Sequence, residues 1–183
     1  MSAVLWLEDL SVRFRTTRGT VNAVQGLSFE VGEGETVALV GESGSGKSTA
    51  ALALLRLVAD PPGRIAGGRI LFEGRDILGL GDEELRAVGG GRIAMIFQDL
   101  MMALNPVYTI ERQVGEVLRL HAGLGRDAIA AEVVELLRLV GVPAPAERAR
   151  QYPHNLSGGM RQRVMIAMAL ACKPKLLIAD EPT

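Results

Sequence analysis

Alternating apolar and polar positions near the start of the chain predict a layer of β-strands. Residues 4–14 alternate in this way, which is typical of a strand with one exposed face. A turn at residues 18–20 separates this segment from a second predicted strand at residues 21–31. One more short strand is predicted at residues 68–74. We therefore expect an added β layer in the first part of the fold.

Three continuous apolar runs predict buried strands of a central sheet. They lie at residues 37–40, 92–97 and 176–181. The first run is followed by a glycine-rich turn and then by an apolar stretch at residues 50–58 that predicts a helix. Residues 82–86 are typical of a capped helix start. Strands that alternate with helices indicate an α/β fold.

Between residues 100 and 150 the apolar side chains recur at helical spacing. Glycines 123 and 125 separate two predicted helices, and residues 141–145 end the second one. We expect a mostly helical insert between two core strands, with the apolar stripes forming its core and not a ligand site. The two stripes are Ile110, Val114, Val117 and Leu118, and then Val133, Val134, Leu136, Leu137 and Val140.

Composition and charge narrow the class of protein. The 183 residues suffice for one domain with a sizeable core, and the net charge of −1 gives no basic footprint for nucleic acid. The single cysteine, Cys172, excludes an internal disulfide framework and fits a reducing compartment. Because it lies in an apolar helical run, we interpret it as an inert core thiol and not as a reactive nucleophile.

Neither a signal peptide nor a membrane span is predicted. The N-terminus has no basic region and reaches an acidic residue at Glu8, unlike a signal peptide. No apolar run approaches the roughly 18 residues that cross a bilayer. We expect a cytoplasmic protein whose membrane role is exerted through a partner.

Residues 41–49 read GESGSGKST and follow the pattern of a phosphate-binding loop. Glycines permit backbone angles that turn successive N–H groups onto phosphate, and the next helix adds the positive end of its dipole. Lys47 is placed for the β- and γ-phosphates and Ser48 for Mg²⁺. The strand–loop–helix order disfavours the alternative, a chance glycine turn before a helix. The candidate residues are Gly41, Glu42, Ser43, Gly44, Ser45, Gly46, Lys47, Ser48 and Thr49.

A pair of carboxylates ends the last predicted strand. Asp180 can hold Mg²⁺ through water, and Glu181 can orient or deprotonate an attacking water. An acidic strand end that merely faces solvent is the alternative, and it is common by itself. Downstream of a phosphate-binding loop it becomes the minority interpretation.

A second glycine-containing segment precedes the last predicted helix, which runs to about residue 171. Ser157, Gly158 and Gly159 can present a further set of N–H groups to an anion. One nucleotide does not need two such cradles from one chain, so a second cradle makes sense if it serves the nucleotide of a second copy. A simple serine N-cap with a glycine turn is an equally good interpretation of these residues taken alone.

Taken together, these motifs resemble the nucleotide-binding domain of an ATP-binding cassette (ABC) transporter. They are GESGSGKST at 41–49, Gln98 at a strand end, LSGGMRQRV at 156–164 and LLIADEPT at 176–183, in the family's order and spacing. The resemblance covers the whole chain. The segment at 97–107 and the continuation of the 156–164 motif to residue 172 look like the oligopeptide/dipeptide and nickel importer subgroup.

The resemblance implies a P-loop NTPase fold of the ABC type that binds ATP and Mg²⁺ and hydrolyses ATP. Phe14 matches the aromatic residue that stacks on adenine, although a core phenylalanine is nearly as good an interpretation. Residues 41–49 would hold the phosphates. Asp180 would serve Mg²⁺, and Glu181 would be the general base.

The resemblance also implies contacts with other subunits. Gln98 would contact Mg²⁺ and the attacking water and couple the site to a transmembrane partner. Ser157, Gly158, Gly159 and Met160 would close on the γ-phosphate of ATP bound by a second ATP-binding subunit, identical or related, in a head-to-tail dimer. A helical insert at about residues 99–155 would dock on transmembrane permease subunits, and a solute-binding protein would take part indirectly.

Two local positions depart from the subgroup's pattern. Residues 100–103 read LMMA where the subgroup usually has Pro-Met-Thr-Ser, which puts details of the coupling loop in doubt but not nucleotide binding. Met160 replaces the commoner glutamine of the family's signature, as often in this subgroup.

The end of the chain is a larger departure. The family continues past the DEPT motif with a further core strand that carries a switch histidine. His121 and His154 both precede the Asp180 strand, so neither matches it. We expect an incomplete ABC-type domain, truncated after this motif, that is marginally stable and a poor ATPase alone. Its parts would be residues 1–98 (β layer and P-loop core), 99–160 (helical subdomain) and 161–183 (signature helix and Asp180 strand).

The function that the resemblance implies is the ATP-binding and ATP-hydrolysing subunit of a peptide importer, peripheral on the cytoplasmic face of the membrane. Two alternatives remain at this point: a soluble ABC ATPase not tied to transport, and an inactive fragment. The first is disfavoured because no long charged heptad run and no net positive charge is present. The transported solute, the direction of transport and the identity of the second subunit are left open.

Overall fold

The computed structural model describes residues 3–97 and 104–180 of the chain. The chain falls into two compact units, Met1–Leu85 and Arg86–Thr183. Gln98, Glu181 and the LMMA segment at 100–103 therefore lie outside the described residues.

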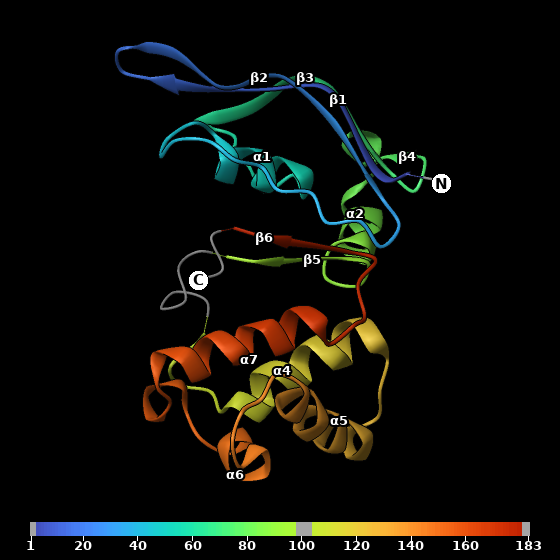
Figure 1. Ribbon diagram of the computed structural model, residues 1–183, viewed down its shortest axis with the longest axis vertical. Helices are drawn as coiled ribbons and strands as arrows, with labels where there is room; N and C mark the ends of the chain where they lie inside the picture. Colours follow the sequence, from blue (N-terminus) through green and yellow to red (C-terminus); the bar gives the residue numbers. More distant parts are fainter. Residues whose placement is uncertain (1–2, 98–103, 181–183) are drawn as a thin grey trace. The chain divides into compact units, whose positions relative to one another are not determined.

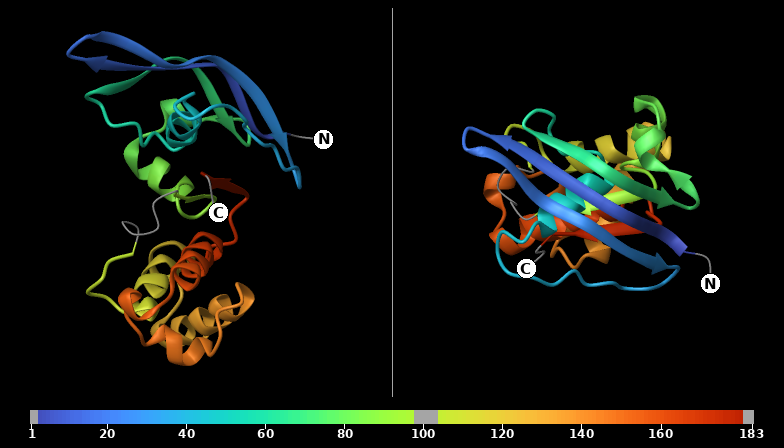
Figure 2. Two further views of the ribbon diagram at one scale, coloured as in Figure 1. Left: turned by 60° about the vertical axis from the view of Figure 1, so that its left-hand side comes forward. Right: turned by 90° about the horizontal axis from the view of Figure 1, so that it is seen from above.

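An antiparallel sheet forms most of the first unit. It consists of β1 (Ala3–Thr16), β2 (Gly19–Gly32), β3 (Gly63–Phe72) and the two-residue β4 (Arg75–Asp76), in the order β2-β1-β3-β4 (Figures 1 and 2). This confirms the predicted β layer, and its strands are longer than the sequence pattern indicated, because the pairing extends into the turns.

One face of this sheet is the core of the first unit. Leu5, Leu7, Leu10 and Val12 of β1 are buried there. Helix α1 (Lys47–Leu54) contacts β1 and β2 and contributes buried side chains of its own, Ala50, Ala53 and Leu54. The helix follows directly from the phosphate-loop motif, so the packing of α1 holds that loop against the sheet.

Two details of the α1 region differ from the prediction. The buried strand predicted at residues 37–40 is wrong: these residues have no strand structure, and Val37, Leu39 and Val40 are 43%, 44% and 89% exposed. A strand needs a hydrogen-bonded neighbour, and no described strand pairs with this segment. Helix α1 also ends at Leu54 rather than at residue 58, since Arg56 takes a left-handed conformation with φ 53°.

The second unit contains a small parallel sheet packed on a helix. The two predicted core runs form strands β5 (Ile93–Ile96) and β6 (Leu176–Ala179), and these pair with each other in parallel. Helix α7 (Gly158–Leu170) covers them, with Ala169 packed against Ala94 and Ile96. The one-turn helix η1 (Ile77–Gly79) and helix α2 (Asp82–Val88) precede β5.

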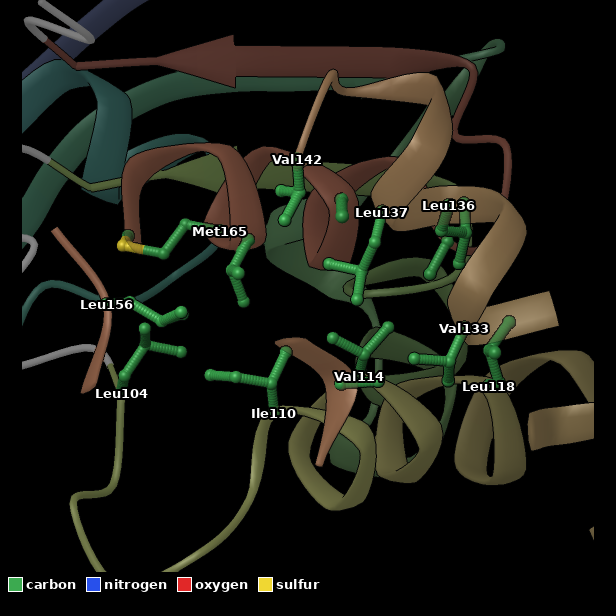
Figure 3. Packing of buried hydrophobic residues seen from close by; sticks show 14 residues of the cluster. Leu104, Ile110, Val114, Leu118, Val133, Leu136, Leu137, Val142, Leu156 and Met165 are labelled. Atoms are coloured by element: carbon green, nitrogen blue, oxygen red, sulfur yellow. The ribbon is translucent and has the colours of Figure 1, made fainter. Parts of the chain in front are cut away.

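The predicted helical insert is confirmed. It consists of α4 (Ile110–Val117), continued by the π-helical η2 (Leu118–Ala122), then α5 (Arg126–Leu139), α6 (Pro145–Ala149) and the short η3 (Pro153–Asn155). Helix α6 is an addition, since the sequence pattern ended the second predicted helix at residues 141–145 and named no further helix in the insert. The predicted apolar stripes meet α7 in one core (Figure 3), whose members include Ile110, Val114, Leu118, Val133, Leu137, Leu156, Val164 and Met165.

A buried glutamine fixes the loop that leads into this helical region. Gln113 of α4 is 7% exposed. Its amide nitrogen donates to the backbone oxygens of Asn105 (3.0 Å) and Tyr108 (2.9 Å), and its amide oxygen accepts from the backbone N–H of Asn105 at 2.8 Å. These three hydrogen bonds from one buried side chain satisfy backbone groups that are not paired within a helix or a sheet. The loop that follows the Gln98 segment is thus anchored to α4.

Cys172 follows α7 as a partly buried free thiol, 3.9 Å from the carbonyl oxygen of Val117. Burial raises the pKa of this thiol, which disfavours the nucleophilic thiolate and agrees with the interpretation as a core thiol. Among the described helices, none has the length and apolar content required to cross a membrane.

Candidate functional site

The glycine-rich loop ends in an open helix N-terminus. Gly46 is the N-cap of α1 and has φ 94° and ψ 7°, a left-handed conformation that side chains rarely adopt. No side chain caps the helix. The N–H groups at the start of a helix have no partner within the helix, and the helix dipole favours negative charge there. This end of α1 is suited to hold phosphate.

Gly46 is also required by its surroundings. A Cβ atom at this position would overlap the carbonyl oxygen of Ala23 on β2 and touch the side chain of Val24. The loop therefore lies directly on β2, and glycine makes this approach possible. Gly44 has φ 80°, but a Cβ there would meet nothing within 4 Å.

This contrast gives a matched pair of substitutions. Gly46→Ala is expected to lower the free energy of unfolding by more than about 2 kcal/mol, since it combines left-handed strain with a backbone clash. Gly44→Ala is expected to cost about 1 kcal/mol, since it adds the strain alone. Chemical denaturation of both variants measures the difference. Equal midpoints for the two variants would contradict the close approach of Gly46 to β2.

Lys47 folds back over the loop. Its ammonium group donates to the backbone oxygens of Gly41 and Glu42, each at 2.8 Å. The N–H of Ser45 donates to the oxygen of Glu42 at 3.2 Å, which closes the turn beneath it. Residues 41–45 are exposed, so the positive charge lies at an accessible loop. This places one ammonium group beside the uncapped N-terminus of α1.

The remaining candidate residues lie in the same loop or in the first turn of α1. Ser43 is exposed, and Ser48 and Thr49 are half-buried in the first turn of α1. A Cβ at Gly41 would crowd the hydroxyl of Ser45, at 2.7 Å. The structure therefore brings the motif residues together in one loop and one helical turn, as the motif requires.

The acidic strand end lies beside a neighbouring strand end in the second unit. Asp180 follows β6, and its N–H donates to the oxygen of Ile96 at 3.0 Å. Because β5 and β6 are parallel and in register, their carboxyl ends meet at one edge of the sheet. The chain continues from these two ends into Gln98 and Glu181, so their predicted roles stay predictions.

Ser157 caps helix α7. Its hydroxyl accepts from the N–H of Met160 at 3.3 Å, which is the capping interaction that the sequence left open as an alternative. The cap uses one N–H of the first turn. Arg161 donates to the oxygen of Leu156 at 3.1 Å, and the Arg163 guanidinium donates to the oxygen of Gly141, which holds the start of α7 in place.

Packing within residues 3–97 and 104–180 does not require glycine at the two positions after the cap. Gly158 and Gly159 are exposed, neither has a positive φ, and a Cβ at either would meet nothing within 4 Å. Glycine at the start of a helix also costs stability relative to alanine. The predicted role of these glycines toward a partner's nucleotide stays a prediction.

Phe14 lies half-buried on β1, opposite Gly63 of β3. A Cβ at Gly63 would stand 2.7 Å from the ring of Phe14 and 2.7 Å from Val58. The ring therefore covers a glycine of the neighbouring strand. A packing role is thus visible, and the predicted stacking on adenine stays a prediction.

Sequence reasoning overlooked two features. Gln113 occupies a position in the apolar stripe of α4, between Ile110 and Val114, where a polar residue signals a buried hydrogen-bond network. Arg13 and Arg64 lie on separate strands, and only the strand register shows that they face each other.

Comparison with known proteins finds similarity to one protein family and to several transport ATP-binding proteins. The sequence profile described as "ABC transporter" matches residues 24–183. The chain is 50% identical over 183 residues to the oligopeptide transport ATP-binding protein OppD of Bacillus subtilis, covering 100% of this chain and 51% of OppD. It is 48% identical over 181 residues to the dipeptide transport ATP-binding protein DppD of Escherichia coli, covering 99% of this chain and 55% of DppD. The chain thus spans about half the length of these relatives.

A solved structure agrees with these matches. The ATP-binding cassette MJ0796, in a dimeric post-hydrolysis state bound to ADP and Pi, matches with a TM-score of 0.86 and 28% identity. The match covers 98% of this chain and 74% of that one.

Proposed function

This chain belongs to the ABC transporter family, and from that premise we propose that it is the ATP-binding and ATP-hydrolysing part of a peptide importer subunit. The observation that carries the proposal is the phosphate loop, where Lys47 stands beside the uncapped start of α1. The names of the relatives OppD and DppD support peptides as the transported solute.

The loop residues fit a nucleotide triphosphate. The N–H groups at the start of α1 bind and orient phosphate oxygens, and Lys47 exchanges its two carbonyl partners for phosphate oxygens. A charge-assisted bond to phosphate is roughly twice as strong as a neutral one. Phe14 bounds the adenine side of the site.

The hydroxyl and carboxylate candidates fit a hard divalent cation, which prefers oxygen ligands. Ser48, Gln98 and Asp180 would hold Mg²⁺, which neutralises charge on the transferred phosphoryl group. Glu181 orients the attacking water and accepts its proton. Residues 1–98, 99–160 and 161–183 are the corresponding parts of the domain.

A second ATP-binding subunit completes the site in this proposal. Ser157, Gly158, Gly159 and Met160 approach the nucleotide of the partner, for which the bare helix start at the two glycines leaves room. MJ0796, described as dimeric and bound to ADP and Pi, supports this arrangement. The chain then acts at the cytoplasmic face of the membrane, bound to permease subunits through residues 99–155 and served by a solute-binding protein.

Co-purification tests the transport assignment. The chain is expected to co-purify with the tagged membrane subunits of a peptide transporter, since the helical region that follows the Gln98 segment would dock on them. Two variants separate docking from folding. One has alanine in place of Val107, which is 69% exposed, and the other has alanine in place of the buried Val114. A folded chain that binds ATP but never associates with membrane subunits would favour an ABC ATPase outside transport.

A further inference from the structure

We propose that the β layer carries a second site, which binds a small soluble polyanion with phosphate or carboxylate groups. The site is an open cavity of about 580 Å³ in the first unit. Three arginines, Arg13, Arg15 and Arg64, line it together with Thr20 and Asp60. None of its lining residues belongs to the phosphate loop at 41–49, so the proposal goes beyond the ATP site.

Strand register brings the three arginines together. Arg13 of β1 and Arg64 of β3 are direct partners in the antiparallel ladder. Arg15 lies two residues along β1 and therefore points to the same face as Arg13. The N–H of Arg15 also donates to the oxygen of Pro62 at 2.9 Å, which ties the loop of Asp60 and Pro62 to the edge of the cavity.

This arrangement is unfavourable for the chain alone. Like charges directly opposite each other destabilise a β-ladder. Three guanidinium groups against the one carboxylate of Asp60 leave a local charge of 3 − 1 = +2, whereas the whole chain carries −1. An anion in the cavity would remove the repulsion.

The three arginine side chains are unpaired in the described part of the chain, whereas five other arginines form ion pairs. Arg69, Arg75, Arg119, Arg138 and Arg148 each form an ion pair with a glutamate. The guanidinium groups of Arg13, Arg15 and Arg64 have no ion pair or hydrogen bond within residues 3–97 and 104–180. Their donors are therefore available to a ligand.

The shape of the cavity favours a small molecule over a membrane surface. Its volume lies within the roughly 300–1,000 Å³ typical of small-molecule sites, and it exceeds the size of a single phosphate. Pro61 and Ala66 give it apolar walls beside the arginines. Guanidinium groups bind phosphate and carboxylate oxygens with two parallel bonds, which suits a ligand with at least two anionic groups.

Calorimetric titration with inorganic pyrophosphate at low salt tests the proposal. The titrated full chain carries Lys47→Ala, which weakens the phosphate loop without adding ATP, itself a polyanion that the arginine cavity would bind. Pyrophosphate is then expected to bind still, and the pair of substitutions Arg13→Ala and Arg64→Ala is expected to weaken it about 100-fold, roughly tenfold for each charged donor. Arg69→Ala on the same strand β3, whose guanidinium pairs with Glu8 at 2.5 Å, is the matched control and should leave binding unchanged.

The outcomes separate this site from the ATP site. Absence of pyrophosphate binding by the Lys47→Ala chain, or equal binding after the arginines are replaced, would overturn the proposal. Binding to phosphatidylglycerol vesicles without binding of pyrophosphate would overturn it in favour of a lipid surface. Thermal melting checks that the double variant is folded. If the double variant is unfolded, the titration is repeated with the single substitution Arg64→Gln. ATP binding that is unchanged by Lys47→Ala would count against the ATP site alone.

Discussion

Substitution of Lys47 with alanine is expected to weaken ATP binding about 100-fold. A charge-assisted hydrogen bond to a phosphate oxygen contributes about 1.5–3 kcal/mol, and 1.4 kcal/mol corresponds to a factor of ten in affinity. The ammonium group already lies against the loop, 2.8 Å from the oxygens of Gly41 and Glu42, so little reorganisation is needed before it meets phosphate. Its removal leaves these two exposed oxygens to water, and the fold should be retained.

Titration with a fluorescent ATP analogue and Mg²⁺ measures this effect. Arg18→Ala is a suitable control, because it removes one positive charge from the exposed turn between β1 and β2 and leaves the loop intact. The control is expected to bind as the unsubstituted chain does. If Lys47→Ala also binds normally while remaining folded, the phosphates are held somewhere other than the loop at residues 41–49.

Replacing both Gly158 and Gly159 with alanine is expected to have opposite effects on stability and on pairing. The chain itself should gain several tenths of a kcal/mol up to about 1 kcal/mol, since alanine is the better helix former and its Cβ meets open space at both positions. ATP-dependent association of two copies should weaken at least about tenfold, because two methyl groups then stand where the partner's nucleotide approaches. ATP affinity of the single chain should not change.

Sedimentation velocity with and without ATP measures the association, and thermal melting measures the stability. Gly79→Ala serves as control, since a Cβ at Gly79 also meets nothing within 4 Å and its φ is not positive. A double variant that pairs as well as the unsubstituted chain would show that the two glycines do not face a partner's nucleotide. The serine cap alone would then account for this segment.

Local patterns predicted most of the elements well. The helix after the phosphate loop and the strand segments β5 and β6 follow from residues close together in the chain. The cap at Ser157 was one of the two interpretations that the sequence left open. Gly46 is an example. Its left-handed φ and the nearby carbonyl oxygen of Ala23 both require glycine, and the phosphate-loop motif has glycine at this position.

Features that depend on residues far apart in the chain were harder to predict from the sequence. The strand predicted at residues 37–40 fails because a strand forms only against a neighbour, which apolar content does not supply. The bonds of Gln113 to Asn105 and Tyr108 depend on how a loop folds back on α4. The arginine cavity depends on the register of β1 with β3, which periodicity alone does not give.

The predicted site is likewise assembled from separate parts. The loop at 41–49 and the start of α7 could be predicted as phosphate cradles from their glycines and the helices that follow. Asp180 could be predicted at a strand end, and the pairing of its N–H with Ile96 shows which strand end lies beside it. The roles of Gln98 and Glu181 rest on the family's pattern.

Equilibrium dialysis of the chain against ATP and Mg²⁺ tests the central claim most directly, with circular dichroism to show that the chain is folded. We expect saturable ATP binding at the 41–49 loop, and its loss in the Lys47→Ala variant. A folded chain that takes up no ATP would contradict the assignment of the 41–49 loop as a working nucleotide site.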